Sequence, residues 1–263
     1  MKKTRKLVRC SARSLIAMGL SLTMVLGISM EVSADEADAK RILKSMSDYL
    51  AAQKTLSFEY DIAYEVVTQD GQKLALMSSG NVAMERPNKI RTTRTGGFVD
   101  VETFFDGKTL TLLGKNLNSY TQVEIPGNIS HLVDELRVKY DRPIPAADLL
   151  LPNSYDELML DVIDIKDLGS GVINGVECDF LAFRKKEVDW QIWIAQGERP
   201  YPLRYTITSK LISNGPQYTI QTRDWQTGVD FSFKNPTQAN KIELKDLKGT
   251  GGLPENFKMG VSK

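Results

Sequence analysis

Apolar and polar residues alternate with a period of two over most of this chain. The first such segment begins at Thr55, and one of its faces carries Phe58, Tyr60, Ile62, Tyr64 and Val66. Successive side chains of a β-strand point to opposite faces of a sheet, so this pattern predicts a half-buried strand. Similar patterns predict strands over residues 72–85, 89–95, 98–105, 108–113, 119–124, 162–168, 176–184, 188–195, 203–211, 217–225 and 231–233.

Short turns join most of the predicted strands. Asp70-Gly71 and Asp106-Gly107 are strong signals for tight turns. Because a tight turn reverses the chain, we expect neighbouring strands to pair antiparallel. Gly80 lies inside one strand and indicates a bend or a bulge there. The pattern therefore predicts an antiparallel sheet of about eleven strands.

Two segments have a helical period instead. Residues 36–53 place acidic side chains in their first turn and apolar ones at helical spacing, namely Ile42, Met46, Tyr49 and Leu50. Residues 126–160 interrupt the strand series with a second apolar stripe, which contains Leu132, Val133, Leu136 and Tyr140. The proline-punctuated stretch DRPIPAADLLLPNSYDELML then predicts one or two short helical turns. Proline lacks a backbone donor, so we do not expect this stretch to join the sheet interior.

Two or three helices are too few to cover so wide a sheet if the sheet is flat. Many of its strands are amphipathic, so one face needs cover while the other meets water. A sheet that curls around the helices solves this problem. We therefore predict an α+β fold, a half-barrel with helices on its concave face. A two-sheet sandwich is the alternative.

The first 34 residues have the pattern of a secretory signal peptide. A basic segment precedes an apolar run of about 17 residues and the small-residue end Val32-Ser33-Ala34. We expect export to the periplasm, cleavage after Ala34, one folded domain over residues 35–247 and a loosely ordered tail over residues 248–263. The alternative is an uncleaved membrane anchor, but the run lies at the lower edge of the length that spans a bilayer.

Removal of this leader changes the charge balance. It contains six of the 34 Lys and Arg residues and one of the 33 acidic residues, so residues 35–263 carry 28 basic and 32 acidic side chains. A net charge of −4 argues against a nucleic-acid partner, which requires phosphate neutralisation. The whole chain has one His and two Cys, which argues against a zinc finger or a disulfide scaffold.

The sequence lacks the usual catalytic motifs, including G-x-S-x-G, H-E-x-x-H, C-x-x-C and the P-loop. His131 is interpreted as a partly exposed residue at a helix start rather than a member of a triad. Cys178, alone after leader removal, is interpreted as a small buried side chain without a disulfide partner. We therefore expect no enzyme activity, no cofactor and no metal.

Five stretches of the chain resemble a known family. They are VAMERPNKIR, FFDGKTLTLL, PIPAADLLLP, PQYTIQTRDW and a long segment containing DWQIWI, and the resemblance covers nearly all of residues 36–245. The family consists of predicted periplasmic proteins of unknown function, a DUF family grouped with the LolA/LolB-like lipoprotein carriers. This resemblance implies an eleven-stranded half-barrel with a helical lid, whose concave apolar face holds acyl chains. The regulator RseB and mycobacterial lipid carriers resemble the same fold.

The apolar rows on the predicted strands are the candidate ligand-binding surface. Their simplest interpretation is packed core beneath the helices. The functional interpretation is that part of the surface is loosely covered and accepts an acyl chain, which gains about 0.8 kcal/mol per buried methylene. The candidate cavity residues are Phe58, Tyr60, Ile62, Tyr64, Trp190, Ile192, Tyr205, Ile207 and Tyr218. The candidate lid residues are Leu132, Leu136, Leu149 and Leu150, and their segment is either a moving lid or a fixed plug.

Two functions are compatible with these features. The first is a periplasmic, non-catalytic carrier or chaperone for a lipid, a lipoprotein acyl chain or another hydrophobic ligand. The second is an envelope sensor or protein-interaction module on the same fold, similar to RseB. In either case we expect a monomer with no nucleic-acid partner and no stable transmembrane segment after signal cleavage.

Overall fold

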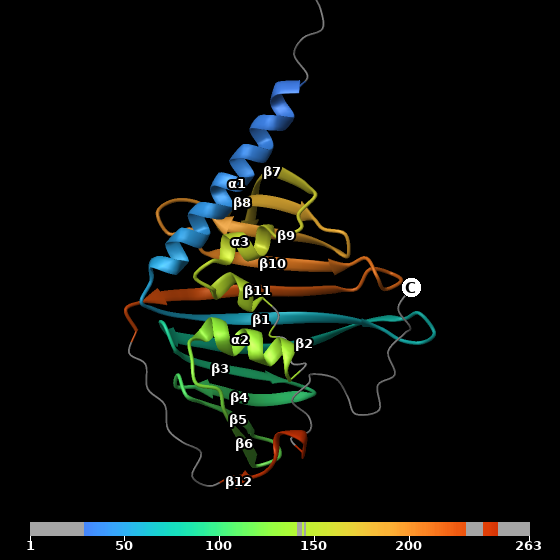
Figure 1. Ribbon diagram of the computed structural model, residues 1–263. Helices are drawn as coiled ribbons and strands as arrows, with labels where there is room; N and C mark the ends of the chain where they lie inside the picture. The colour runs from blue at the N-terminus through green and yellow to red at the C-terminus, as the bar shows by residue number, and fades with distance from the viewer. Residues whose placement is uncertain (1–28, 141–143, 145, 230–238, 247–263) are drawn as a thin grey trace, which may run out of the picture.

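The computed structural model describes residues 29–140, 144, 146–229 and 239–246. The leader up to residue 28, the strand expected over residues 231–233 and the tail expected over residues 248–263 lie outside these described residues. Within the described part of the chain, twelve strands form one sheet in the order β12-β6-β5-β4-β3-β2-β1-β11-β10-β9-β8-β7 (Figure 1).

Two antiparallel meanders build this sheet. The first runs from the centre to one edge and comprises β1 (Thr55–Val67), β2 (Lys73–Glu85), β3 (Lys89–Gly96), β4 (Val99–Phe105), β5 (Thr109–Gly114) and β6 (Ser119–Glu124). The second runs from the other edge back to the centre and comprises β7 (Asp164–Ile173), β8 (Val176–Arg184), β9 (Val188–Ala195), β10 (Pro202–Ser209) and β11 (Gln217–Thr227). Antiparallel pairing of β11 with β1 joins the two meanders.

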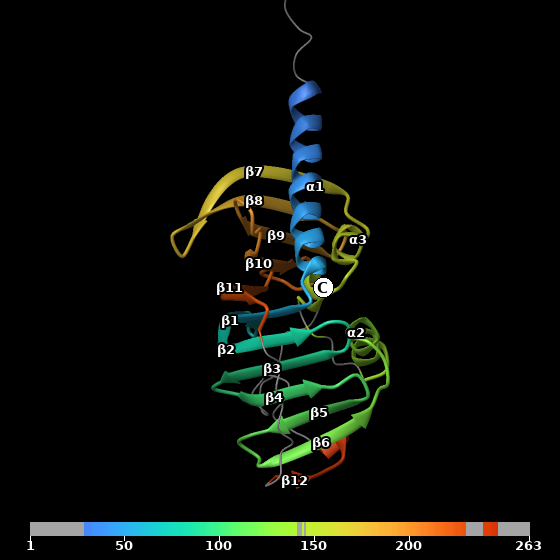
Figure 2. The ribbon, with the colours of Figure 1, turned by 90° about the vertical axis from the view of Figure 1, so that its left-hand side faces the viewer.

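The connection between the meanders has to cross the sheet, because β6 and β7 lie near opposite edges. It comprises α2 (Ile129–Val138), the 3₁₀-helix η1 (Ala147–Leu150) and α3 (Ser154–Met159). We call residues 125–163 the insert. Its helices lie on the same side of the sheet as α1 (Ser29–Ala52), as two perpendicular views show (Figures 1 and 2). The topology thus brings the insert onto one face of the sheet.

The helix α1 covers the β7 half of the sheet. Its fully buried residues are spaced three or four apart along one face: Ala39, Leu43, Met46 and Leu50. The carboxylate of Asp35 accepts a hydrogen bond of 2.8 Å from the backbone N–H of Asp167 in β7. These contacts fix α1 against the edge of the second meander. No helix in the described part of the chain has both the length and the hydropathy needed to span a membrane.

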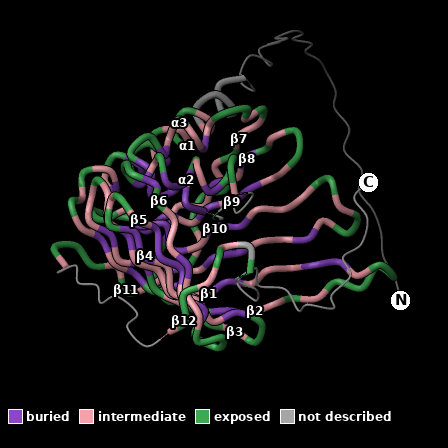
Figure 3. Tube along the Cα trace, turned by 60° about the horizontal axis from the view of Figure 1, so that its bottom comes forward, coloured by how far each residue is buried: buried purple, intermediate pink, exposed green. Residues whose placement is uncertain are grey.

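The expected fold class is confirmed: one antiparallel sheet curls around a few helices, and it is not a two-sheet sandwich. Buried segments gather where the strands face the helices, whereas the hairpin turns that extend away are exposed (Figure 3). The short helical turns expected in the proline-punctuated stretch are present as η1 and α3.

Several element boundaries differ from those expected. The strand β7 runs to Ile173 rather than ending at residue 168, because a register shift between Asp167 and Ser170 lets it continue along β8. The helix α1 begins at Ser29, ahead of the expected start at residue 36, so the expected cleavage site lies within its first turns. The two-residue strand β12 (Asn240–Lys241), which pairs parallel with β6, is too short to leave a sequence pattern.

Candidate functional site

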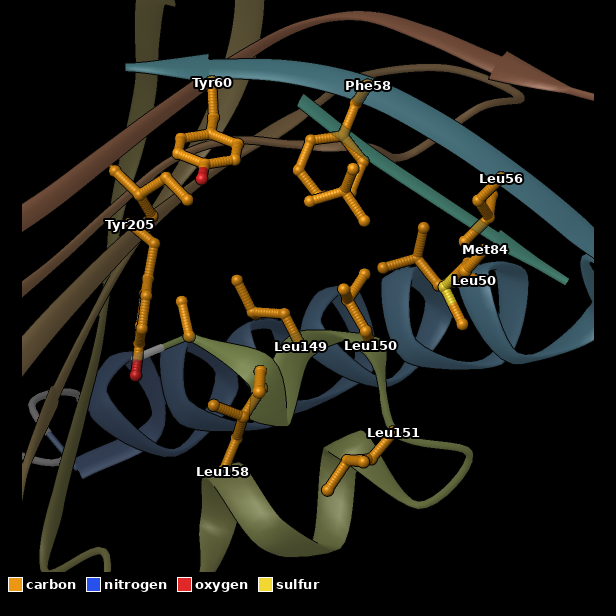
Figure 4. Close-up of a cluster of buried hydrophobic side chains, with 14 of the residues drawn as sticks. Leu50, Leu56, Phe58, Tyr60, Met84, Leu149, Leu150, Leu151, Leu158 and Tyr205 are labelled. Carbon is orange, nitrogen blue, oxygen red and sulfur yellow. The ribbon is translucent and has the colours of Figure 1, made fainter. Parts of the chain in front are cut away.

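A cavity of about 240 Å³ lies between the concave face of the sheet and the insert. Figure 4 shows Phe58 and Tyr60 pointing from β1 toward Leu149 and Leu150 of η1 across this space. From α2 it is lined by Ile129, Leu132, Val133 and Leu136. The cavity is larger than the apolar cavity of about 150 Å³ that binds benzene in an engineered protein. Its lining is therefore suited to an apolar ligand.

In-register pairing of the strands arranges the sheet side of the cavity in rows. One row runs from Phe58 on β1 across β2, β3, β4 and β5, through Val82, Thr92, Thr103 and Leu112. The next row runs through Tyr60, Gly80, Arg94 and Val101. All of these residues except Gly80 line the cavity. The first meander therefore supplies most of the cavity wall on the sheet side.

An aromatic ladder closes the Phe58 end of the cavity. Phe58 stacks on Trp225 with ring centroids 4.1 Å apart, and Trp225 stacks on Tyr201 at 4.8 Å. The hydroxyl of Tyr201 lies 3.1 Å from that of Tyr49 in α1. The ladder thus links β1, β11 and α1 at this end of the cavity.

Gly80 makes room for the side chain of Tyr60. The Tyr60 hydroxyl donates a hydrogen bond of 2.7 Å to the carbonyl of Thr93, next to Gly80. A Cβ atom at Gly80 would lie 1.8 Å from that carbonyl oxygen and 2.7 Å from the Tyr60 hydroxyl. The strand pairing is regular through Gly80, so the glycine provides space rather than the expected bulge.

We expect Gly80→Ala to lower the thermal unfolding midpoint. Overpacking of this kind costs about 1–3 kcal/mol, which corresponds to a drop of about 2–12 °C for a domain of this size. Gly97→Ala is the matched control, because a Cβ atom there meets nothing within 4 Å. Calorimetry of both variants measures the difference, and equal midpoints would contradict the packing at Gly80.

The helix α2 is anchored at its N-terminal end. The side chain of Asn128 accepts a hydrogen bond of 2.9 Å from the backbone N–H of His131, which caps the helix. The N–H of Ile129 donates to the carbonyl of Pro87, 3.0 Å away, in the β2–β3 turn. Beyond this anchor the backbone of α2 comes close to few parts of the sheet, unlike that of α1. Side chains and the cavity fill the space between.

A partly buried carboxylate lies in η1. Burial raises the pKa of Asp148, and the carboxylate of Glu157 acts in the same direction, while Arg137 and Lys185 oppose it. Burial also lowers the pKa of Lys185. The charged form of Asp148 is therefore less favourable in the folded insert than in water.

We expect Asp148→Asn to stabilise the protein by a few degrees at pH 7. A raised folded-state pKa gives stability that is present below the ordinary Asp pKa of about 4 and is lost as the pH rises through the raised value. The Asn side chain does not ionise, so the variant does not lose this stability as the pH rises. Its higher unfolding midpoint relative to the wild type should therefore vanish below about pH 4. Thermal unfolding at a series of pH values tests this, and a variant less stable at neutral pH would show that the attraction to Arg137 and Lys185 dominates.

The structure brings most of the predicted site residues together. Phe58, Tyr60, Ile62 and Tyr218 line the cavity from the sheet, and Leu132, Leu136, Leu149 and Leu150 line it from the insert. Tyr64 and Ile207 line a second pocket of about 180 Å³, which shares Tyr218 with the first. Trp190, Ile192 and Tyr205 lie in the buried hydrophobic core and line neither space.

Sequence reasoning missed the cavity residues of β2 to β5. Their concave positions are Val82, Ile90, Thr92, Arg94, Val101, Thr103 and Leu112. The two tight-turn signals were the available clue for β2 and β5, because Asp70-Gly71 sets the register of β2 with β1 and Asp106-Gly107 sets that of β5 with β4. Cys178 is buried and free, and burial raises the pKa of its thiol. Among the described residues, no group of three or more His, Cys, Asp or Glu side chains is placed to hold a metal.

The sequence profile of one family, described as "Predicted periplasmic protein (DUF2092)", matches residues 39–245. An uncharacterized protein of Methanocaldococcus jannaschii is 24% identical over 168 residues, which cover 64% of this chain and 43% of that relative. The chain thus spans less than half the length of the curated relative it matches.

Solved structures with a similar arrangement include three proteins. Lipoprotein LppX of Mycobacterium tuberculosis is 13% identical, with 74% of this chain and 98% of that chain covered and a TM-score of 0.43. In the MucA/MucB complex of Pseudomonas aeruginosa the matched chain is 15% identical, with 74% of this chain and 59% of that chain covered and a TM-score of 0.42. A LolA superfamily protein of Nitrosomonas europaea gives 12% identity, 74% and 94% coverage and a TM-score of 0.34.

Proposed function

This chain belongs to the DUF2092 family of predicted periplasmic proteins, and we propose that it is a carrier or chaperone that holds a hydrophobic ligand between its sheet and its insert. The observation that carries this proposal is the cavity of about 240 Å³ beneath α2 and η1. Burial of an acyl chain yields about 0.8 kcal/mol per methylene. A chain in this cavity therefore binds without any need for polar contacts along its length.

We propose binding rather than catalysis, because of what lines the cavity. Most of its side chains are aliphatic or aromatic, and the remainder are hydroxyl groups and the single guanidinium of Arg94. Such a lining suits an apolar ligand with few polar groups. A lipid or a lipoprotein acyl chain is the class of ligand that fits it.

The proposed route to the periplasm is export with cleavage after Ala34. Cleavage there leaves Asp35, whose carboxylate accepts a hydrogen bond from β7, at the start of the mature chain. N-terminal sequencing of the periplasmic protein tests this proposal, and a chain that still begins at Met1 would overturn it.

Uptake of lipid by the delipidated protein tests the proposed function. We expect 1:1 binding of dodecanoic acid in native mass spectrometry and transfer of fatty acid between vesicles. Val101→Trp fills the cavity and should abolish both, whereas Val172→Trp places the same side chain on the exposed face of β7 and should leave both unchanged. Absence of uptake by the wild-type protein would contradict the carrier function.

One observation favours the alternative, a protein-interaction module. The strand β7 forms an edge of the sheet among the described strands, and apolar side chains on β7 and β8 are exposed there, at Leu168, Val172 and Val176. Unpaired edges of this kind accept an added strand from a partner. If the protein is a sensor, we expect a stable complex with a partner protein, which Val172→Lys disrupts. We then also expect no transfer of lipid between vesicles.

A further inference from the structure

Arg94 is the one charged residue among the described side chains that line the cavity. It extends from β3 between Gly80 on β2 and Val101 on β4. Its Nε donates a hydrogen bond of 2.9 Å to the Ser78 hydroxyl, and no carboxylate among the described residues pairs with it. The guanidinium thus brings an uncompensated positive charge, with further N–H donors, to an otherwise apolar space.

Two tyrosines accompany Arg94 at the same end of the cavity. Tyr60 uses its hydroxyl as a donor to Thr93, but no described residue hydrogen-bonds to the hydroxyl of Tyr218. Burial raises the pKa of Tyr60 to about 12 and also raises that of Tyr218, while the charge of Arg94 acts in the opposite direction on both. Both phenols therefore keep their protons at neutral pH, and both line the cavity together with Arg94. Tyr218 is left with a free hydrogen-bond donor.

The two ends of the cavity differ in character. The Phe58 end is closed by the aromatic ladder of Trp225 and Tyr201. At the other end Arg94, Val101 and Tyr218 are only partly buried, so this end meets solvent. An apolar dead end with a positively charged, partly open end matches a molecule that has one apolar chain and one negatively charged end.

We propose that the ligand is a single-chain amphiphile with an anionic head group, a carboxylate or a phosphate, held by Arg94 and Tyr218 with its chain directed toward Phe58. This inference rests on the proposed function and specifies the ligand class. A charge-assisted hydrogen bond from a guanidinium to an oxyanion orients the head group. The cavity of about 240 Å³ accommodates part of one chain rather than several chains.

Binding of four probes to the delipidated protein tests this proposal: dodecanoate, dodecyl phosphate, dodecanol and acetate. We expect Arg94→Gln to weaken dodecanoate and dodecyl phosphate binding by about 10–100-fold and dodecanol binding less than about threefold. Arg94→Lys keeps the charge and should recover most of the lost affinity, which also shows that the site is folded. Acetate, which lacks the chain, should bind too weakly to measure.

Arg91→Gln is the matched control. Arg91 lies on the same strand but points to the other face, where its Nε lies 2.6 Å from a carboxylate oxygen of Glu102. The Arg91→Gln substitution removes the same charge from the protein and should leave dodecanoate binding unchanged. If Arg94→Gln weakens the binding of dodecanoate, dodecyl phosphate and dodecanol equally, or weakens none of them, the head-group inference fails while the carrier function stands. If no chain binds, both fail, and if acetate binds as tightly as dodecanoate, the site is one for small anions.

Discussion

Leu136→Asp is expected to detach the insert from the sheet while both meanders stay folded. Leu136 is 4% exposed and lines the cavity from α2. Loss of its burial alone costs about 1.5–3 kcal/mol, and an unpaired carboxylate against apolar side chains adds to that cost. The open state should therefore become roughly 10–100-fold more populated or more. Hydrogen exchange should rise over residues 129–159, and binding of an apolar dye to the sheet should increase.

Val138→Asp is the control for this experiment. Val138 lies on the same helix and is 81% exposed, so the same substitution there should change neither exchange nor dye binding. The anchor of α2 at Asn128 and Ile129 is untouched by both variants. Global unfolding of Leu136→Asp, with loss of protection in the strands as well, would show that the insert is a fixed plug and part of the core.

Trp190→Ala is expected to cause a large loss of stability without a direct effect on the cavity. Trp190 is 2% exposed, stacks on Phe183 with centroids 3.9 Å apart and meets Tyr205 edge to face at 5.7 Å. Truncation of a buried Trp costs about 3–5 kcal/mol, which corresponds to a drop of about 6–20 °C in the unfolding midpoint. Below that midpoint, dodecanoate should bind with unchanged affinity.

Trp193→Ala on the same strand separates this core role from a general effect of losing a tryptophan. Trp193 lies on the other face of β9, stacks on Phe180 at 4.3 Å and is partly exposed. Its truncation should cost less than half as much stability. A Trp190→Ala variant that keeps its stability but loses ligand binding would place Trp190 in the binding surface instead of the core.

The alternation of apolar residues predicts the cavity face of β1 because that strand is central and half-covered. Phe58, Tyr60 and Ile62 all face the cavity, and the tight turn at Asp70-Gly71 sets the register with β2. The strand β3 gives no such signal. Its cavity face reads Ile90, Thr92 and Arg94, which is mostly polar, so hydrophobicity alone does not distinguish that face from the solvent face.

The same alternation predicts Trp190, Ile192 and Tyr205 as equivalent to the β1 row. Whether such a row becomes packed core or cavity wall depends on which helix packs against it. Trp190, Ile192 and Tyr205 belong to the buried core, which also contains Leu43 and Met46 of α1, whereas the β1 row faces the cavity beneath α2 and η1. That difference arises from contacts between residues far apart in the chain, and no local pattern in β9 or β10 contains it.

The position of a bound acyl chain tests the carrier account most directly. Isotope-filtered nuclear Overhauser spectra of dodecanoate in complex with the delipidated protein measure which side chains lie beside the chain. We predict contacts from the chain methylenes to Phe58, Leu132 and Leu149, on opposite walls of the cavity. Contacts confined to the outer face of the sheet, or no intermolecular contacts at all, would contradict it.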